Sequence, residues 1–239
     1  MRRLVAILNI LLFFFLFDLI KCENAAENTF SRIYDSKAWG PDGLGSGYGS
    51  SLEYTDITRR IMFRFFQHYG IHTMVDAPCG SFLWMRVLLS RNPQINYTGL
   101  DVVPAVIDRL KNEFKLVTRW RFHHADLSKA SFRFPSKPDL IFSRDMFQHL
   151  PLSLILRILR NMVIARPRYI MLGAYKSGTN TNITIGDYFS IDWLVHPFFF
   201  INPMLEYKER ADNPQKFLYV YNRTQFQKWN LRRKVPAHL

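Results

Sequence analysis

The chain has 239 residues, of which 48% are hydrophobic, so it can bury one sizeable core and we expect one folded domain. Its formal net charge is +13, but the basic residues are dispersed from Arg59 to Arg121, with one cluster in a predicted basic tail at 226–239. This distribution does not favour a nucleic-acid partner. Two cysteines, Cys22 and Cys79, are too few for a disulfide framework.

The N-terminus has the pattern of a secretory signal. Arg2 and Arg3 precede a largely apolar run from Leu4 to Phe17, and polar residues follow. We expect residues 1–22 to be a cleaved signal peptide or a short signal-anchor, with membrane contact only through residues 4–20 if uncleaved. The protein is then secreted or lumenal, in the endoplasmic reticulum or Golgi. Three glycosylation sequons fit this placement: Asn96, Asn182 and Asn222.

Residues 23–33 are polar and aperiodic, which predicts a flexible linker before the folded domain. Five glycines then crowd the segment Trp39–Ser51, so we expect it to be neither helix nor strand. Ser50 and Glu53 have capping-box spacing and predict the start of a helix that ends at Gly70.

Beyond Gly70, apolar strand-like runs alternate with helical patterns, which predicts parallel strands joined by crossover helices. The expected strands span 72–77, 95–100, 120–124, 140–143 and 169–174, and the expected helices span 82–89, 104–114 and 152–163. Two further runs, 203–209 and 216–221, face each other across a loop and predict a closing hairpin.

Acidic residues and one glycine follow the first two of these strands. Asp76 ends the first strand and Gly80 lies in the turn after it, while Asp101 ends the second. This is the layout of a nucleotide-binding α/β half-unit, in which the glycine lets a ligand approach the backbone and a carboxylate accepts the ribose hydroxyls. The usual three-glycine pattern is reduced here, because Pro78 and Phe82 occupy two of its places.

From Tyr34 to Tyr221 the chain resembles class I S-adenosylmethionine-dependent methyltransferases. The resemblance rests on Trp39-Gly40, on Gly45-Ser46-Gly47-Tyr48-Gly49-Ser50, and on Asp76-Ala77-Pro78-Cys79-Gly80 leading to Trp84-Met85. It implies a domain over 34–225 with a Rossmann-like, seven-stranded, mostly parallel sheet, helices on both faces and a C-terminal antiparallel hairpin. It also implies S-adenosylmethionine as the cofactor.

The resemblance implies a set of cofactor-binding residues. Asp76 would hold the amino-acid end and Asp101 the ribose, with Gly80 as the floor. Asp126 would bind the adenine amino group and Leu127 would pack against the ring. Trp39 would contribute from a lid. Each carboxylate also has a plainer interpretation as a turn former or helix cap.

The segment after the fourth strand carries the candidate catalytic residues Arg144, Asp145 and His149. His149 is the candidate general base, with Asp145 orienting it or acting in its place, and Arg144 would bind an anionic acceptor or the cofactor carboxylate. Alternatively, His149 only begins a helix. We expect no metal, since the adjacent His123 and His124 point to opposite faces of a strand.

The function predicted from these patterns is methyl transfer in the secretory pathway, with a hydroxyl acceptor such as a glycan or a small molecule. One alternative is a methyltransferase-like protein that binds a ligand or partner without turnover. A dinucleotide-dependent enzyme is disfavoured by Pro78 and Phe82, which break the glycine pattern that a pyrophosphate requires. The sequence does not specify the acceptor or the oligomeric state.

Overall fold

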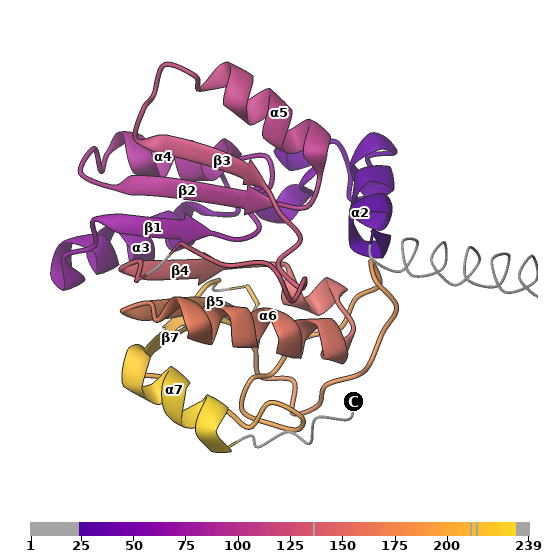
Figure 1. Cartoon of the computed structure of the whole chain (residues 1–239), viewed down its shortest axis with the longest axis vertical. Coiled ribbons are helices and arrows are strands. Elements are labelled where there is room, and N and C mark those ends of the chain that lie inside the picture. The colour runs from indigo at the N-terminus through magenta and orange to yellow at the C-terminus, as the bar shows by residue number, and fades with distance from the viewer. Residues whose placement is uncertain (1–23, 136, 211, 214, 233–239) are drawn as a thin grey trace, which may run out of the picture.

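The computed structural model describes residues 24–135, 137–210, 212–213 and 215–232 (Figure 1). The predicted signal segment 1–22 lies outside these residues. Among the helices that are described, none has both the length and the apolar character needed to cross a membrane.

A single seven-stranded sheet organises the described chain, in the order β3-β2-β1-β4-β5-β7-β6. Five neighbouring strands are parallel, and β7 runs antiparallel to both β5 and β6. The strands are β1 Thr73–Asp76, β2 Asn96–Asp101, β3 Trp120–His124, β4 Leu140–Ser143, β5 Tyr169–Tyr175, β6 Leu205–Lys208 and β7 Lys216–Asn222. The predicted parallel sheet with a closing hairpin is confirmed.

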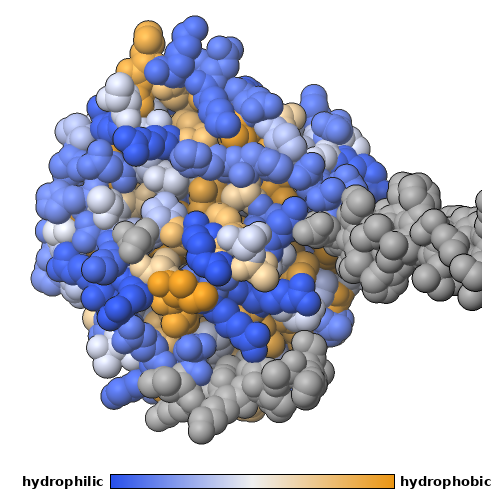
Figure 2. All heavy atoms as spheres, in the orientation of Figure 1, coloured by the Kyte–Doolittle hydropathy of each residue, from blue (hydrophilic) through white to orange (hydrophobic). Residues whose placement is uncertain are grey.

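Helices cover both faces of the sheet, as predicted (Figure 1). One apolar cluster joins the sheet to α3 Asp56–Tyr69, α4 Leu83–Ser90 and α5 Pro104–Glu113. The other joins it to α6 Leu152–Ala165 and α7 Arg223–Arg232. Hydrophilic residues dominate the outer face seen in Figure 2, and apolar ones form smaller patches there. The sheet is therefore buried on both sides, as parallel strands require.

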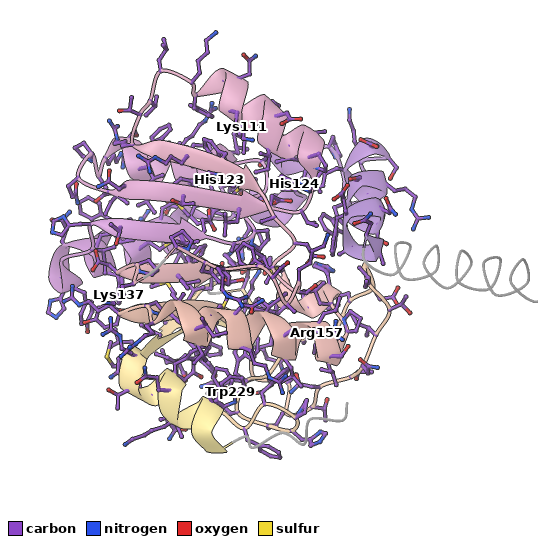
Figure 3. All side chains as sticks on the ribbon, in the orientation of Figure 1. Lys111, His123, His124, Lys137, Arg157 and Trp229 are labelled. Carbon is purple, nitrogen blue, oxygen red and sulfur yellow. The ribbon has the colours of Figure 1, made fainter. Side chains whose placement is uncertain are left out.

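Two predicted boundaries are wrong. Residues 23–33 were expected to be a flexible linker, but α2 spans Ala25–Asp35. Its apolar side chains recur about every four residues and pack on the domain, which favours the helix over coil. The predicted basic tail at 226–239 is helical as far as residue 232, because Phe226 and Trp229 are buried in α7, at 2% and 3% exposure. Trp229 is labelled in Figure 3. Residues 233–239 lie outside the described chain.

The helix expected to start at Ser50 begins later, at Asp56. Ser51 is extended, with ψ at 157°, and its side chain accepts a hydrogen bond from the Tyr54 amide at 3.1 Å. A separate turn therefore precedes the helix. The glycine-rich segment contains only two short 3-10 helices, η1 Asp42–Gly45 and η2 Tyr48–Ser50, so the prediction of irregular structure was nearly right.

Candidate active site

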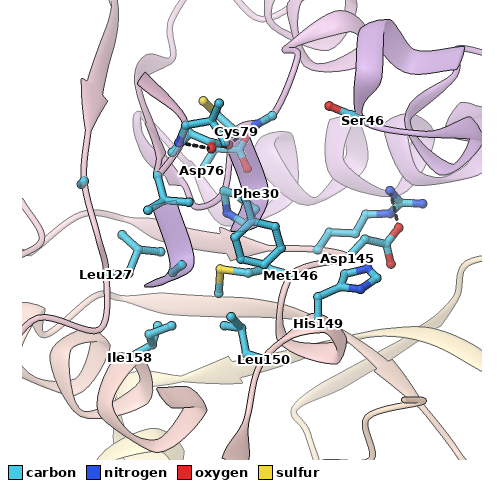
Figure 4. Close-up of a pocket in the computed structure, with 18 of the residues that line it drawn as sticks. Phe30, Ser46, Asp76, Cys79, Leu127, Asp145, Met146, His149, Leu150 and Ile158 are labelled. Atoms are coloured by element: carbon cyan, nitrogen blue, oxygen red, sulfur yellow. Dashed lines mark hydrogen bonds and ion pairs between the residues drawn. The ribbon is translucent and has the colours of Figure 1, made fainter. Parts of the chain in front are cut away.

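One pocket opens at the carboxyl ends of the parallel strands, and all nine site residues predicted from the sequence line it. They are Trp39, Asp76, Gly80, Asp101, Asp126, Leu127, Arg144, Asp145 and His149. Figure 4 shows Asp145 and His149 together at one end, Asp76 and Cys79 at another, and Leu127 and Ile158 along an apolar wall. Crevices outside strand carboxyl ends are the usual ligand sites of open α/β sheets.

Asp101 holds the turn that forms the floor of the pocket. Its Oδ2 accepts a hydrogen bond from the Gly80 amide at 2.9 Å, and its Oδ1 accepts one from the Val103 amide at 3.0 Å. Burial raises the pKa of Asp101, and the bonds from these backbone amides oppose that rise. Each carboxylate oxygen retains a second lone pair, so the side chain can still accept two ribose hydroxyls.

Asp76 has an unused acceptor at the pocket. The side chain is 2% exposed, its Oδ2 accepts a bond from the Tyr97 hydroxyl at 2.7 Å, and its buried Oδ1 has no partner among the described residues. Burial raises the pKa of Asp76 to about 8, although the Tyr97 hydroxyl lowers it. An unpaired buried carboxylate oxygen is costly, and a cationic donor would satisfy it. The ammonium of S-adenosylmethionine fits this requirement.

Asp126 and Leu127 line the pocket after β3, where the adenine is expected. Asp126 Oδ1 also accepts bonds from the Ser128 amide at 2.9 Å and from the Ser128 hydroxyl at 2.7 Å. The turn-forming role that the sequence allowed is thus present alongside the pocket position. Leu127 is 6% exposed and offers an apolar contact for a planar ring.

The N-terminal helix α2 closes part of this pocket, where the sequence predicted a flexible linker. Ala26, Phe30 and Tyr34 line the pocket from α2, at a spacing of four residues that signals one helical face. The Tyr34 hydroxyl lies 2.5 Å from Ser46 Oγ, which accepts a bond from the Ser81 amide at 2.9 Å. We call Tyr34, Ser46 and Ser81 the latch, because they join α2, the glycine-rich segment and the floor.

The latch explains why a glycine is needed at position 80. Gly80 has φ at +51°, and a Cβ there would lie 2.9 Å from Ser46 Oγ. We predict that Gly80→Ala lowers the free energy of unfolding by more than the ~1–2 kcal/mol of a left-handed backbone. Gly70→Ala is the control, since Gly70 has φ at +56° and a Cβ there would have no neighbour within 4 Å. Urea unfolding should show a larger loss of stability for Gly80→Ala than for Gly70→Ala. Equal losses of stability in the two variants would contradict close packing of Ser46 against Gly80.

His149 has the hydrogen bonding of a neutral base. Its Nδ1 lies 2.9 Å from the carbonyl oxygen of Asp187, which can only accept, so Nδ1 carries the hydrogen and Nε2 is an acceptor. Burial lowers the pKa of His149, which keeps the ring neutral near pH 7. The ring centroid of Trp39 lies 5.0 Å from that of His149. The orienting bond predicted from Asp145 therefore comes from Asp187 instead.

Asp145 belongs to a buried charge cluster that also contains Arg144, Glu209 and Lys216. Lys216 Nζ lies 2.9 Å from Asp145 Oδ1 and 3.8 Å from Glu209 Oε2. Arg144 pairs with Asp145 at 2.8 Å and donates to Glu209 through Nε. Two cations thus balance two carboxylates, so the free anion-binding arginine that we expected is already neutralised. Sequence spacing gave no sign of Glu209 or Lys216.

The cluster fixes the ionisation of Asp145. Burial would raise the pKa of this carboxyl, but Arg144 and Lys216 hold it well below its usual range. For Lys216, burial would lower the pKa, and the Asp145 and Glu209 carboxylates raise it. Asp145 is therefore a fixed anion in the pocket, which leaves His149 as the better proton acceptor.

Residues 74–165 match a family model described as a methyltransferase domain. The segment from β1 to α6 is thus similar to methyltransferase domains. A search of curated proteins found no match. The methyltransferase domain of a bacterial protein, CtHen1-CN, is 16% identical with a TM-score of 0.55, over 71% of this chain and 99% of that one.

Two larger methyltransferases have the same fold. Human N-acetylserotonin methyltransferase in complex with SAM is 15% identical with a TM-score of 0.59, over 82% of this chain and 59% of that one. The mitomycin 7-O-methyltransferase MmcR is 14% identical with a TM-score of 0.55, over 72% of this chain and 55% of that one. The chain thus spans little more than half of either protein. These matches confirm the predicted fold.

Proposed function

We propose that this protein transfers a methyl group from S-adenosylmethionine to a hydroxyl acceptor. The observation that carries the proposal is one pocket in which Asp76 Oδ1 has no donor among the described residues, while the neutral His149 lies at the other end. When bound, the cofactor supplies a methyl group activated by its sulfonium. Asp76 would hold the ammonium, Asp101 the ribose hydroxyls, and Asp126 with Leu127 the adenine.

The chain's own contribution to transfer is alignment and removal of a proton. Methyl transfer is a displacement at carbon, in which the acceptor O–C bond forms, the S–C bond breaks and the acceptor O–H proton leaves. His149 Nε2 would take that proton, since Nδ1 is fixed on Asp187. Asp145 is held as an anion by its two cationic neighbours and would orient the acceptor rather than deprotonate it.

We further propose that the acceptor is a glycan or another small hydroxylated molecule of the secretory pathway. The signal-like segment 1–22 and the exposed sequons at Asn96 and Asn182 support this compartment. Beside His149, the rings of Trp39 and Tyr188 lie at 5.0 and 5.7 Å, and Tyr188 is 55% exposed. Aromatic faces of this kind suit the apolar face of a sugar or phenol ring.

Calorimetric titration of the full chain with S-adenosylmethionine and S-adenosylhomocysteine tests the cofactor part of the proposal. Asp101→Ala should weaken binding about tenfold, or ~1.4 kcal/mol, because the ribose hydroxyls lose a charged acceptor. Asp108→Ala is the control, since Asp108 is exposed on α5 and does not line the pocket. The melting temperature of Asp101→Ala must be followed, because this variant also frees the Gly80 and Val103 amides.

The outcomes separate an enzyme from a binding module. Binding by wild type and loss in Asp101→Ala, followed by transfer of labelled methyl to a glycan or phenol panel, would support the enzyme. Binding without transfer to any hydroxyl acceptor would favour the non-catalytic alternative. Failure of the folded wild-type chain to bind either ligand would refute the proposal.

A further inference from the structure

A second hollow lies between α3 and α4, and none of its lining residues lines the candidate active site. Arg59, Arg60 and Arg64 line it from α3, and Arg91 lines it where α4 ends. Asp56 is the one carboxylate among its lining residues. We call this hollow the arginine groove. The fold thus brings Arg91 next to three arginines that are close together in the sequence.

The arginine groove is lined by more arginines than carboxylates. Asp56 is shared between Arg59, at 3.3 Å, and Arg60, at 2.5 Å. Arg64 and Arg91 have no acidic partner among the described residues. Four arginines therefore line a groove that holds one carboxylate, and an anionic ligand would reduce the repulsion between their charges.

Electrostatics at Arg59 agree with this crowding. Its side chain is only 17% exposed, and it donates bonds of 2.7 Å to the Leu52 carbonyl and the Thr55 hydroxyl. Burial lowers the pKa of Arg59; Asp56 opposes this, while Arg91 and Arg60 lower it further. The guanidinium groups are thus close enough to repel one another.

Three apolar residues, Phe63, Val87 and Leu88, also line the arginine groove. Phe63 is 40% exposed there, while Leu88 is 3% exposed and Val87 is partly buried. Leu88 is almost fully buried, so a flat bilayer surface would meet the guanidinium groups and not this side chain. A chain narrow enough to enter the groove would meet both, with its anions on the guanidinium groups and a ring face on Phe63.

We propose that the arginine groove binds an acidic glycan, through its sulfate or carboxylate groups. Guanidinium groups bind such oxyanions with two parallel hydrogen bonds, which lysine cannot reproduce. The sugar rings supply apolar faces for Phe63 and Val87. The site is separate from methyl transfer and does not depend on it.

The test uses the full chain and a heparin-derived octasaccharide as the probe, titrated at 0.05 and 0.15 M NaCl. The triple variant Arg60→Ser, Arg64→Ser, Arg91→Ser should bind at least ~30-fold more weakly than wild type, because three charge-assisted contacts are lost. A matched triple variant, Arg121→Ser, Arg157→Ser, Arg160→Ser, removes the same charge from exposed positions away from the arginine groove. Its affinity for the octasaccharide should fall about threefold or less, as expected when only long-range attraction between the protein's net charge and the sulfates is reduced.

The double variant Arg64→Ser, Arg91→Ser covers the case in which the triple variant fails to fold, since neither residue has an acidic partner in the part of the chain that the structure describes. It should weaken binding about tenfold. Equal losses in the two triple variants would overturn the proposal, because binding would then follow net charge. No binding by wild type would also overturn it, as would tighter binding of single-stranded RNA or of vesicles containing phosphatidylserine.

Discussion

Replacing Lys216 with methionine should lower the free energy of unfolding by about 3–5 kcal/mol, the range found when one partner of a buried ion pair is removed. Lys216 is 3% exposed, and its Nζ lies 2.9 Å from Asp145 Oδ1. Without the ammonium, the buried carboxylate of Glu209 and the partly buried one of Asp145 would have Arg144 as their one cationic partner among the described residues. The loss should be visible as a lower urea midpoint at pH 7.

The control and a double-mutant cycle make this prediction specific. Lys208→Met changes an exposed lysine of the same hairpin and should shift stability by ~0.5 kcal/mol or less. Adding Asp145→Asn to Lys216→Met removes the stranded anion, so the double variant should be more stable than Lys216→Met alone. If Lys216→Met behaved like Lys208→Met, the ion pairs would contribute little and Asp145 would not be held by them.

The sheet could be predicted because each strand and helix is marked by the pattern of apolar residues within its own stretch of sequence. Each buried parallel strand is a short apolar run, and each crossover helix carries an apolar face, as with Ile155 and Leu159 in α6. The acidic strand ends could be assigned for the same reason, since the carboxyl ends of parallel strands meet at one edge. The pocket thus unites Asp76, Asp101 and Asp126 as the topology requires.

The parts that were missed depend on contacts between distant segments. Lys216 reaches Asp145 because β5 and β7 pair in the register that puts Tyr175 opposite Lys216. No spacing in the sequence encodes that register. α2 was missed for another reason: its polar composition suggested a linker, and its helix is stabilised by packing on the pocket through Phe30 and Tyr34. Tertiary packing overrode the local polarity.

Cofactor binding should depend strongly on pH through Asp76. Its pKa of about 8 means that most molecules carry a protonated, neutral Asp76 at pH 6. Only the ionised form pairs with the ammonium of the cofactor, so the apparent affinity falls with the ionised fraction. The α-amino group of the cofactor titrates near pH 8 and loses its positive charge above that pH. The affinity for the cofactor should therefore peak close to pH 8 and be roughly 20-fold weaker at pH 6.

Asp76→Asn isolates this contribution, because asparagine keeps an oxygen to accept the Tyr97 hydroxyl and cannot ionise. Calorimetric titration at pH 6, 7, 8 and 9 should show a peak for wild type and no rise between pH 6 and 8 for Asp76→Asn. An equal rise in both proteins would assign the pH dependence to another group.

The raised pKa of Asp76 also predicts how the stability of the protein without cofactor depends on pH. The folded-state pKa of Asp76 lies above the ordinary value of 3.8, so the folded state binds the proton more tightly than the unfolded chain does. The stability gained from this proton is full below about pH 4 and is lost as the pH rises through about 8. Wild type should therefore lose stability relative to Asp76→Asn over that range, and S-adenosylmethionine should restore it at pH 8, where its ammonium pairs with Asp76 Oδ1.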